Sequence, residues 1–174
     1  MMAQRTFATP LHAFVKKFAS TKPGAWFGAQ VLHHCDRLFL KLPGRRRTLT
    51  GIISGLPVVT LTTTGAKSGL PRTVPLLCIR DPEAPKRFAL VASNWGQRHY
   101  PAWYHNLKAT PQASGNIQGE VVQYNAHEAE GDEYQRFWEL AQATYPGFPN
   151  YKKRIGDQRH IPIMVMTPVE VTPD

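Results

Sequence analysis

Hydrophobic positions divide the chain into a helical first part and a β-rich second part. Over residues 9–18 and again over 26–42, apolar side chains recur every three or four positions, the spacing of one face of an α-helix. From Pro57 onward, apolar residues alternate with polar ones or form short runs, as they do in strands. The pattern predicts a helical N-terminal extension over residues 1–50 and a β-rich domain over 51–174.

The second part contains six segments with strand character. Turn residues separate most neighbouring segments, so hairpin connections dominate and the predicted sheet is mainly antiparallel. Helical spacing returns only after Pro101 and around 134–141. We therefore expect an α+β fold in which about six strands form a small barrel with helices on its outside. The six segments are 57–62, 73–79, 88–92, 113–117, 120–128 and 161–166.

The first predicted hairpin, over 60–75, carries candidate chemistry. Two glycines stand at its turn, with Lys67 between them and Arg72 just beyond. Two cations beside a glycine-rich bend with several hydroxyls suit a phosphate or a carboxylate. The spacing differs from a Walker-type loop, which needs glycines where Leu61 and Ala66 stand. The same residues also fit an ordinary exposed hairpin with solvated charges.

Two further stretches combine polar and aromatic residues in predicted loops. Residues 93–100 follow the apolar run 88–92, and Pro101 then opens a helix whose N-terminus adds a partial positive charge. A loop of this kind is a favourable place for a ligand. Residues 145–151 read as a turn dense in aromatics, followed by three cations at 152–154. These aromatics either line a pocket for a flat hydrophobic molecule or pack under the turn.

Charge and cysteine content restrict the partners and the compartment. The 174 residues carry a formal net charge of +9 and have a pI near 9.8, which favours a nucleic acid, an acidic lipid surface or a polyanionic small molecule as partner. Cys35 and Cys78 lie in apolar surroundings, as buried thiols in a reducing cytoplasm do. Neither has a metal-ligand partner at useful spacing. No secretory signal or membrane-spanning stretch is readable, so we expect a cytoplasmic protein.

The N-terminal helices allow two interpretations. Lys16 and Lys17 lie off the apolar face of the first helix, and Arg45-Arg46-Arg47 follows the second. A basic amphipathic helix can lie on an anionic membrane, or it can pack on its own domain or in a dimer. Peripheral membrane contact is therefore one expectation, and packing is the other.

Four ordered motifs resemble the deazaflavin-dependent nitroreductase family, over roughly residues 57–168. They are the Thr-Thr-Thr-Gly-Ala-Lys-Ser-Gly-Leu-Pro-Arg run at 62–72, Ala-Ser-Asn-Trp-Gly at 92–96, Pro-Ala-Trp-Tyr-His-Asn-Leu-Lys at 101–108, and the pair 145–147 and 161–163. Members of that family are split β-barrels that bind coenzyme F420, an 8-hydroxy-5-deazaflavin with a phosphate and an oligoglutamate tail. The resemblance implies an F420H2-dependent oxidoreductase that transfers a hydride to a hydrophobic acceptor such as a quinone, an enone or a nitroaromatic.

The resemblance also implies roles for individual residues. Lys67 and Arg72 would hold the phosphate, and Pro75 would border the ring. The loop after 88–92 would approach the deazaflavin through its backbone, and the helix after Pro101 would complete that side. The aromatics of 145–151 would shape the acceptor side. The loop residues are Ala92, Ser93, Asn94 and Trp95, the helix residues Ala102, Trp103 and Asn106, and the aromatics Tyr145, Phe148 and Tyr151.

Two positions depart from the family pattern. Trp95 stands where nitroreducing relatives often have glycine, which narrows the mouth of the pocket. Phe148 stands where some relatives have a tyrosine that protonates or orients the acceptor, so any proton must come from elsewhere. Ser68 and Ser93 have no readable base partner, and we expect no covalent nucleophile and no metal.

Alternatives to an F420 enzyme remain at this level. The first is a non-catalytic split barrel in which Lys67 and Arg72 grip the carboxylate of a fatty acid or another lipid. A split barrel that uses flavin mononucleotide or haem is another. Nucleic-acid binding would rest on charge alone, because no aromatic and basic platform for single strands is readable, and we expect none. A monomer and a homodimer are both compatible with the sequence.

Overall fold

A computed structural model describes residues 56–169. The predicted extension over 1–50, with its amphipathic helices, the triple arginine and Cys35, lies outside the described residues. The proposed domain boundary at residue 51 lies outside them too.

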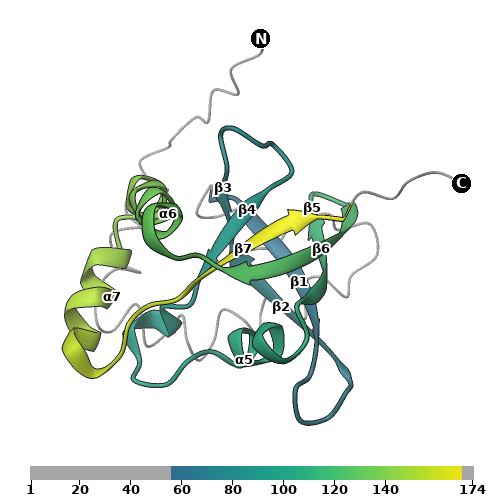
Figure 1. Ribbon diagram of the computed structural model, residues 1–174, viewed down its shortest axis with the longest axis horizontal. Helices are drawn as coiled ribbons and strands as arrows, with labels where there is room; N and C mark the ends of the chain where they lie inside the picture. Colours follow the sequence, from purple (N-terminus) through teal and green to yellow (C-terminus); the bar gives the residue numbers. More distant parts are fainter. Residues whose placement is uncertain (1–55, 170–174) are drawn as a thin grey trace, which may run out of the picture.

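The described residues form one seven-stranded sheet in which every pair of neighbours is antiparallel (Figure 1). The order across the sheet is β2-β1-β5-β6-β7-β4-β3. This confirms the predicted antiparallel α+β fold. The strands are β1 (Val58–Thr64), β2 (Pro71–Leu77), β3 (Ile79–Arg80), β4 (Phe88–Val91), β5 (Gln112–Ile117), β6 (Glu120–Glu128) and β7 (Ile163–Pro168).

The seventh strand comes from the segment that the sequence predicted as one strand over 73–79. β2 pairs with β1 up to Leu77, and Ile79 then pairs with Ala89 of β4 instead. Between them the backbone N–H of Cys78 donates to the carbonyl of Pro57 at 2.9 Å. The chain changes strand partner at this residue, which is how a sheet turns a corner as it curls toward closure. β2 also lies against β4, although the two are far apart in the strand order.

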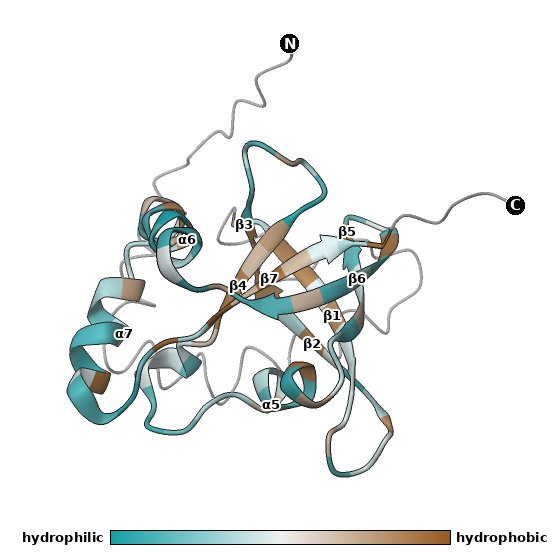
Figure 2. Ribbon diagram, in the orientation of Figure 1, coloured by the Kyte–Doolittle hydropathy of each residue, from teal (hydrophilic) through white to brown (hydrophobic). Residues whose placement is uncertain are grey.

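The curl creates two hydrophobic clusters, one on each face of the sheet. β7 serves both, because Met164 and Met166 join one cluster while Ile163 and Val165 join the other. Figure 2 shows the brown, apolar centre of the sheet at β4 and β7 and the teal outer surfaces of the helices. Burial on both faces explains why the sequence of β7 lacks alternation.

Residues 56–169 contain three α-helices, and two of them contact the sheet. α5 (Ala102–Ala109) contacts β1, whereas α6 (Gly131–Thr144) contacts β3 and β7 on the opposite cluster. Both were predicted, α5 from Pro101 at its start and α6 from the periodicity of its apolar residues. The prediction of a turn over 145–151 is wrong for its second half, because α7 (Phe148–Ile155) begins at Phe148. Pro149 lies in the first turn of this helix. Proline is tolerated there, because the N–H groups of that turn lack an intrahelical partner.

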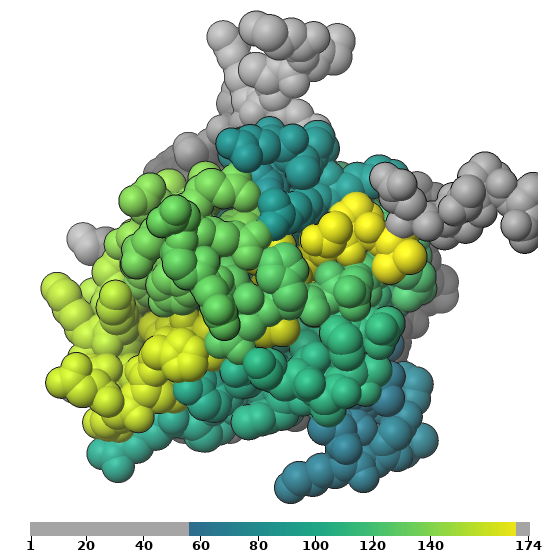
Figure 3. All heavy atoms as spheres, viewed as in Figure 1, coloured from purple at the N-terminus to yellow at the C-terminus, as the bar shows by residue number. Residues whose placement is uncertain are grey.

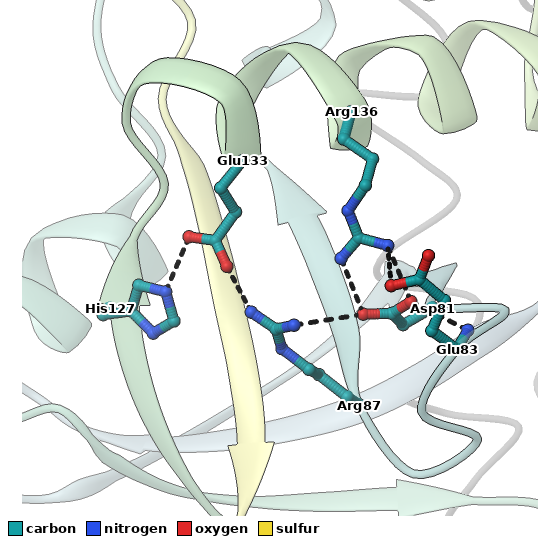
Figure 4. Close-up of polar contacts among 6 residues, drawn as sticks. All are labelled: Asp81, Glu83, Arg87, His127, Glu133 and Arg136. Carbon is teal, nitrogen blue, oxygen red and sulfur yellow. Dashed lines mark hydrogen bonds and ion pairs between the residues drawn. The ribbon is translucent and has the colours of Figure 1, made fainter.

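A buried ionic network attaches α6 to the loop between β3 and β4 (Figure 4). The side chain of Asp81 has 0% accessibility and receives two hydrogen bonds of 2.9 Å from the guanidinium of Arg136. Arg87 contacts Asp81 at 3.3 Å and also pairs with Glu133. The sequence identified this loop only as a turn with an acidic pair. These contacts hold α6 in place and lie outside the predicted cofactor motifs.

Candidate functional site

The turn between β1 and β2 is tight and projects from the body of the molecule (blue in Figure 3). The N–H of Gly65 donates to the carbonyl of Leu70 at 2.9 Å. A side chain at Gly65 would come within 2.6 Å of the Ser68 hydroxyl, and Gly69 has φ +66°. Both positions therefore require glycine, which is why the two glycines of this motif define the turn.

The two predicted phosphate ligands are exposed on this hairpin. A guanidinium nitrogen of Arg72 lies 3.4 Å from the Ser68 hydroxyl and so reaches back over the turn. Among residues 56–169, neither Lys67 nor Arg72 forms an ion pair with a carboxylate. Two cations that are not neutralised by the protein, on a rigid turn, fit an anionic group such as a phosphate. Pro75 lies half-buried further along β2.

Asn106 of α5 attaches the hairpin to the body of the domain. Its buried amide donates to the Thr63 hydroxyl at 2.9 Å and accepts the backbone N–H of Ala66 at 3.0 Å. The amide has one N–H and one lone pair beyond these contacts. Asn106 was predicted to contact the cofactor. The structure places it directly behind the turn that carries Lys67.

The other two predicted residues of α5 differ in exposure. Ala102 is exposed in the first turn of the helix, after Pro101. Trp103 is 7% exposed and belongs to the same hydrophobic cluster as Met164 and Met166. Trp103 therefore packs within this cluster, as large aromatic side chains commonly do.

The loop that leaves β4 has an unusual backbone. Asn94, Trp95 and Gly96 have φ values of 45°, 58° and 80°, so three consecutive residues are left-handed. For residues other than glycine this conformation costs roughly 1–2 kcal/mol each, and such strain gathers at functional sites. Ala92 and Ser93 are buried at the start of the loop, whereas Asn94 and Trp95 are half-buried.

The three aromatics predicted for the acceptor side are buried beside this loop. Tyr145, Phe148 and Tyr151 are 5%, 5% and 2% exposed. The hydroxyls of the two tyrosines lie 3.0 Å apart, and burial is the main cause that raises the pKa of each. α7 packs against the 3-10 turn η2 (Asn94–Gly96), where the ring of Trp95 meets that of Tyr151. The structure thus brings the predicted acceptor residues behind the predicted cofactor loop.

A second polar cluster lies next to the loop and was not predicted. The half-buried Glu128 accepts hydrogen bonds from Tyr104 and Lys108, each at 3.1 Å, and contacts His160 at 3.2 Å. Burial opposes ionisation of Glu128, yet these three partners together hold its pKa below the ordinary value. Burial, and then the bond to Glu128, raises the pKa of Tyr104 to about 12. These residues lie up to 56 positions apart, and no sequence pattern links them.

No described side chain is arranged as a covalent nucleophile. Cys78 is fully buried, and burial raises the pKa of its thiol to about 11, so it stays protonated at neutral pH. Ser68 accepts hydrogen bonds from Arg72 and from the N–H of Leu70. Within residues 56–169, no group of three or more histidine, cysteine or acidic residues is placed to hold a metal ion. The site has three parts. They are the cationic hairpin with Lys67 and Arg72, the strained loop over residues 92–97, and the aromatic wall formed by Tyr145, Phe148 and Tyr151. Together these parts can bind and orient an organic cofactor.

Known proteins share this sequence and this fold. An F420H(2)-dependent quinone reductase of Mycobacterium tuberculosis is 33% identical over 144 residues, which cover 80% of this chain and 91% of the relative. A second such protein of that organism, 30% identical, covers 68% of this chain and 95% of its own length. A solved structure described as an F420-H2-dependent reductase is 38% identical, with a TM-score of 0.57 over 64% of this chain and 94% of its own. Another, described as a domain-swapped dimer, has 38% identity and a TM-score of 0.58 over 64% of this chain and 80% of its own.

The family match begins before residue 51, where the predicted β-rich domain starts. The sequence profile described as F420H(2)-dependent quinone reductase matches residues 39–168, which include every residue of the cationic hairpin, the strained loop and the aromatic wall. The predicted resemblance to deazaflavin-dependent reductases is confirmed, and with it the split-barrel fold; the matched family takes its name from quinone reduction. The similarity favours an enzyme over the lipid-binding alternative. This chain belongs to the F420H(2)-dependent quinone reductase family, and it is an oxidoreductase.

Proposed function

We propose that this protein binds coenzyme F420 between the β1–β2 hairpin and the loop after β4, and that it reduces a quinone. The observation that carries the proposal is the pair of exposed cations, Lys67 and Arg72, on a glycine turn that Asn106 fixes to α5. When bound, the reduced deazaflavin supplies a hydride. The residues of this chain bind the cofactor, orient it and exclude water.

The hairpin takes the charged end of the cofactor in this proposal. Lys67 serves as a flexible point charge for the phosphate, and Arg72 offers a planar set of donors. Pro75 borders the ring, and Ala102 and Trp103 complete that side with Asn106. The excess of positive charge in the whole chain, +9, also draws a polyanionic cofactor toward the site.

The loop after β4 presents its backbone to the ring. The left-handed residues Asn94 and Trp95 hold this segment in a conformation that an unconstrained chain rarely adopts. An organised loop lowers the ordering cost of binding. Ala92 and Ser93, both buried, fix where the loop departs from β4.

The aromatic wall shapes the acceptor side through Trp95. Tyr145, Phe148 and Tyr151 are too buried to offer much surface to an acceptor directly, so they act by setting the position of the Trp95 ring. A hydrophobic acceptor such as a quinone then lies against an aromatic surface. Positioning of donor and acceptor at near-attack distance carries the catalysis.

The family and the charge also bear on where the enzyme works. We place it in the cytoplasm, with peripheral contact to anionic membrane through the N-terminal segments and through the exposed Lys152 and Lys153 of α7. No helix in the described part of the chain is both long and apolar enough to cross a bilayer. Sedimentation with anionic liposomes at low salt, with and without residues 1–50, tests this contact; recovery of both forms in the supernatant would contradict it.

Two measurements test the function: the affinity for two cofactors, and then the turnover of the reduced cofactor with different acceptors. Fluorescence titration should give a lower Kd for coenzyme F420 than for flavin mononucleotide. Oxidation of the reduced cofactor should then be measured against quinones, enones and nitroaromatics, and we expect quinones to react fastest. Tight binding without turnover of any acceptor would indicate a binding protein, and equal affinity for both cofactors would contradict the preference for coenzyme F420.

A further inference from the structure

The return of the chain from α7 to β7 brings one arginine to the strained loop. α7 ends at Ile155 and is capped by Gly156, which has φ +54° and begins a short 3-10 turn, η3 (Gly156–Gln158). Arg159 follows with an extended backbone, and the chain then runs into β7. Its side chain reaches back across the fold to residues more than 60 positions earlier in the sequence.

The guanidinium of Arg159 makes five hydrogen bonds, all to backbone carbonyls. Nη1 donates to Ala92 at 3.2 Å and to His160 at 3.0 Å. Nη2 donates to Ser93 and Gln97, both at 2.9 Å, and Nε donates to Gln97 at 3.1 Å. A guanidinium has five N–H donors, so this side chain is committed to the backbone.

These contacts fix the direction of the peptide groups in the loop. In a trans peptide the N–H points opposite to the carbonyl of the preceding residue, and the described chain has no cis peptide. Since the carbonyls of Ala92 and Ser93 point to Arg159, the N–H groups of Ser93 and Asn94 point away from it. Ser93 is right-handed and Asn94 is left-handed, a combination that makes successive N–H groups converge into an anion-attracting concavity.

The charged group is also held from a second side. The guanidinium carbon of Arg159 lies 4.6 Å from the centroid of the Tyr100 ring, and the Tyr100 hydroxyl lies 3.3 Å from a ring nitrogen of His160. A cation over an aromatic face is stabilised, and packing keeps a flexible side chain in one rotamer. Arg159 is therefore anchored independently of any ligand.

From this geometry we infer that Arg159 is a positioning residue of the cofactor site: it binds three carbonyls of the Ala92–Gln97 loop, so that the N–H groups of Ser93 and Asn94 face the cofactor. The inference rests on the proposed function, because it takes this loop as the surface that meets the deazaflavin. Arg159 acts through the loop and does not touch the cofactor.

The test combines cofactor affinity with amide exchange in the cofactor-free protein. For Arg159→Ala we expect the Kd for oxidised coenzyme F420 to rise about tenfold, since loop ordering must then be achieved on binding. Amide hydrogens of residues 93–98 should exchange faster than in the parent, while those of β5 and β6 should not change. Guanidinium ion at non-denaturing concentration should lower the Kd of the variant, and ammonium should not. Arg98→Ala is the control, because Arg98 is an exposed cation on the same loop.

Arg159→Lys keeps the charge and covers the case in which the alanine variant does not fold. A lysine ammonium has three N–H donors on one nitrogen and cannot reproduce the five hydrogen bonds of the planar guanidinium, so the lysine variant should also bind more weakly than the parent. Parent-like affinity and exchange in either variant would overturn the inference and leave the proposed function standing. Failure of the parent to bind coenzyme F420 would instead overturn the proposed function, and with it the inference.

Discussion

The ring of Trp95 meets the ring of Tyr151 edge to face, with 6.2 Å between the two centroids. Trp95 belongs to the predicted cofactor loop, and Tyr151 belongs to α7 and the predicted acceptor side. A Cβ atom added to Gly96 would lie 3.4 Å from the Cα of Tyr151, so the backbones of the loop and α7 also approach closely here. The contact explains how a buried aromatic cluster can influence a site that it does not line.

This contact leads to a prediction about Trp95, whose φ and ψ of 58° and 20° are strained. Both Trp95→Gly and Trp95→Ala lose the ring contact, but only glycine relieves the left-handed strain. We expect the glycine variant to be about 1 kcal/mol more stable than the alanine variant, whereas at most positions alanine is the more stabilising residue of the two. Urea unfolding measures the difference. An alanine variant at least as stable as the glycine variant would mean that the loop relaxes at no cost.

Phe148 gives a prediction about acceptor preference. Its ring lies 5.4 Å from that of Tyr145 and 6.2 Å from that of Tyr151. Phe148→Ala should cost about 3–5 kcal/mol of stability and shift the ranking of quinones, enones and nitroaromatics, because the wall behind Trp95 becomes loose. Phe148→Tyr should add a hydroxyl donor at a smaller cost. Turnover of reduced coenzyme F420 with the acceptor panel measures this, and one ranking for all three proteins would remove the cluster from the site.

Asn106 gives a prediction about the coupling between hairpin and helix. Asn106→Leu leaves the Ala66 N–H and the Thr63 hydroxyl without their partner, which should cost about 1–3 kcal/mol of stability. The Kd for the cofactor should rise as well, since the turn with Lys67 becomes mobile. Adding Thr63→Val removes one of the stranded groups, so the double variant should be less destabilised than the sum of the two single variants. Simple additivity would show that the two side chains are not coupled.

How far the sequence predicts this molecule depends on whether the determinants are local. The first hairpin turn follows from its glycines, and the strands follow from alternation or from short apolar runs, so these predictions are confirmed. α7 was missed because residues 145–151 were interpreted as a turn, whereas Pro149 is compatible with the first helical turn that it occupies. Arg159 was missed because its acceptors lie 62 to 67 positions away and are backbone carbonyls, which carry no residue-type signal. For Asn106 the sequence indicated the right neighbourhood, although not its bonds to Thr63 and Ala66.

Asp81 gives a prediction about acid stability. The hydrogen bonds from Arg136 are the main cause that holds the pKa of Asp81 below 3.8, outweighing the opposite effect of burial. A carboxyl whose pKa is lower in the folded state stabilises the fold above the unfolded pKa, and the contribution is lost as pH falls through the folded pKa. Asp81→Asn should therefore cost about 1–3 kcal/mol at pH 7, because the half-buried guanidinium groups of Arg136 and Arg87 lose the carboxylate that they share and keep only their outer partners, Glu83 and Glu133.

Urea unfolding of the parent and of Asp81→Asn at pH 7 and at pH 3 checks this. The gap between the two proteins should narrow at the lower pH, where the parent begins to lose the same interaction. Lys86→Ala serves as a control, since Lys86 pairs with Glu120 at a position where both side chains are 66% exposed. A constant gap at both pH values would show that folding does not shift the pKa of Asp81, which would contradict the prediction.

The last prediction concerns the two cations of the hairpin. Lys67→Ala and Arg72→Ala should each weaken binding of coenzyme F420 by about 1.5–3 kcal/mol, the loss expected for one charge-assisted hydrogen bond. Fluorescence titration at several salt concentrations measures this, and the affinity of the double variant should depend less on salt than that of the parent, because the screened attraction is gone. Lys86→Ala, an exposed lysine on another loop, should bind as the parent does. If the double variant kept the affinity of the parent, the phosphate would lie elsewhere, and the hairpin would be an ordinary solvated turn. A loss seen with Arg72→Ala alone would assign the contact to the guanidinium that already lies over the turn near Ser68.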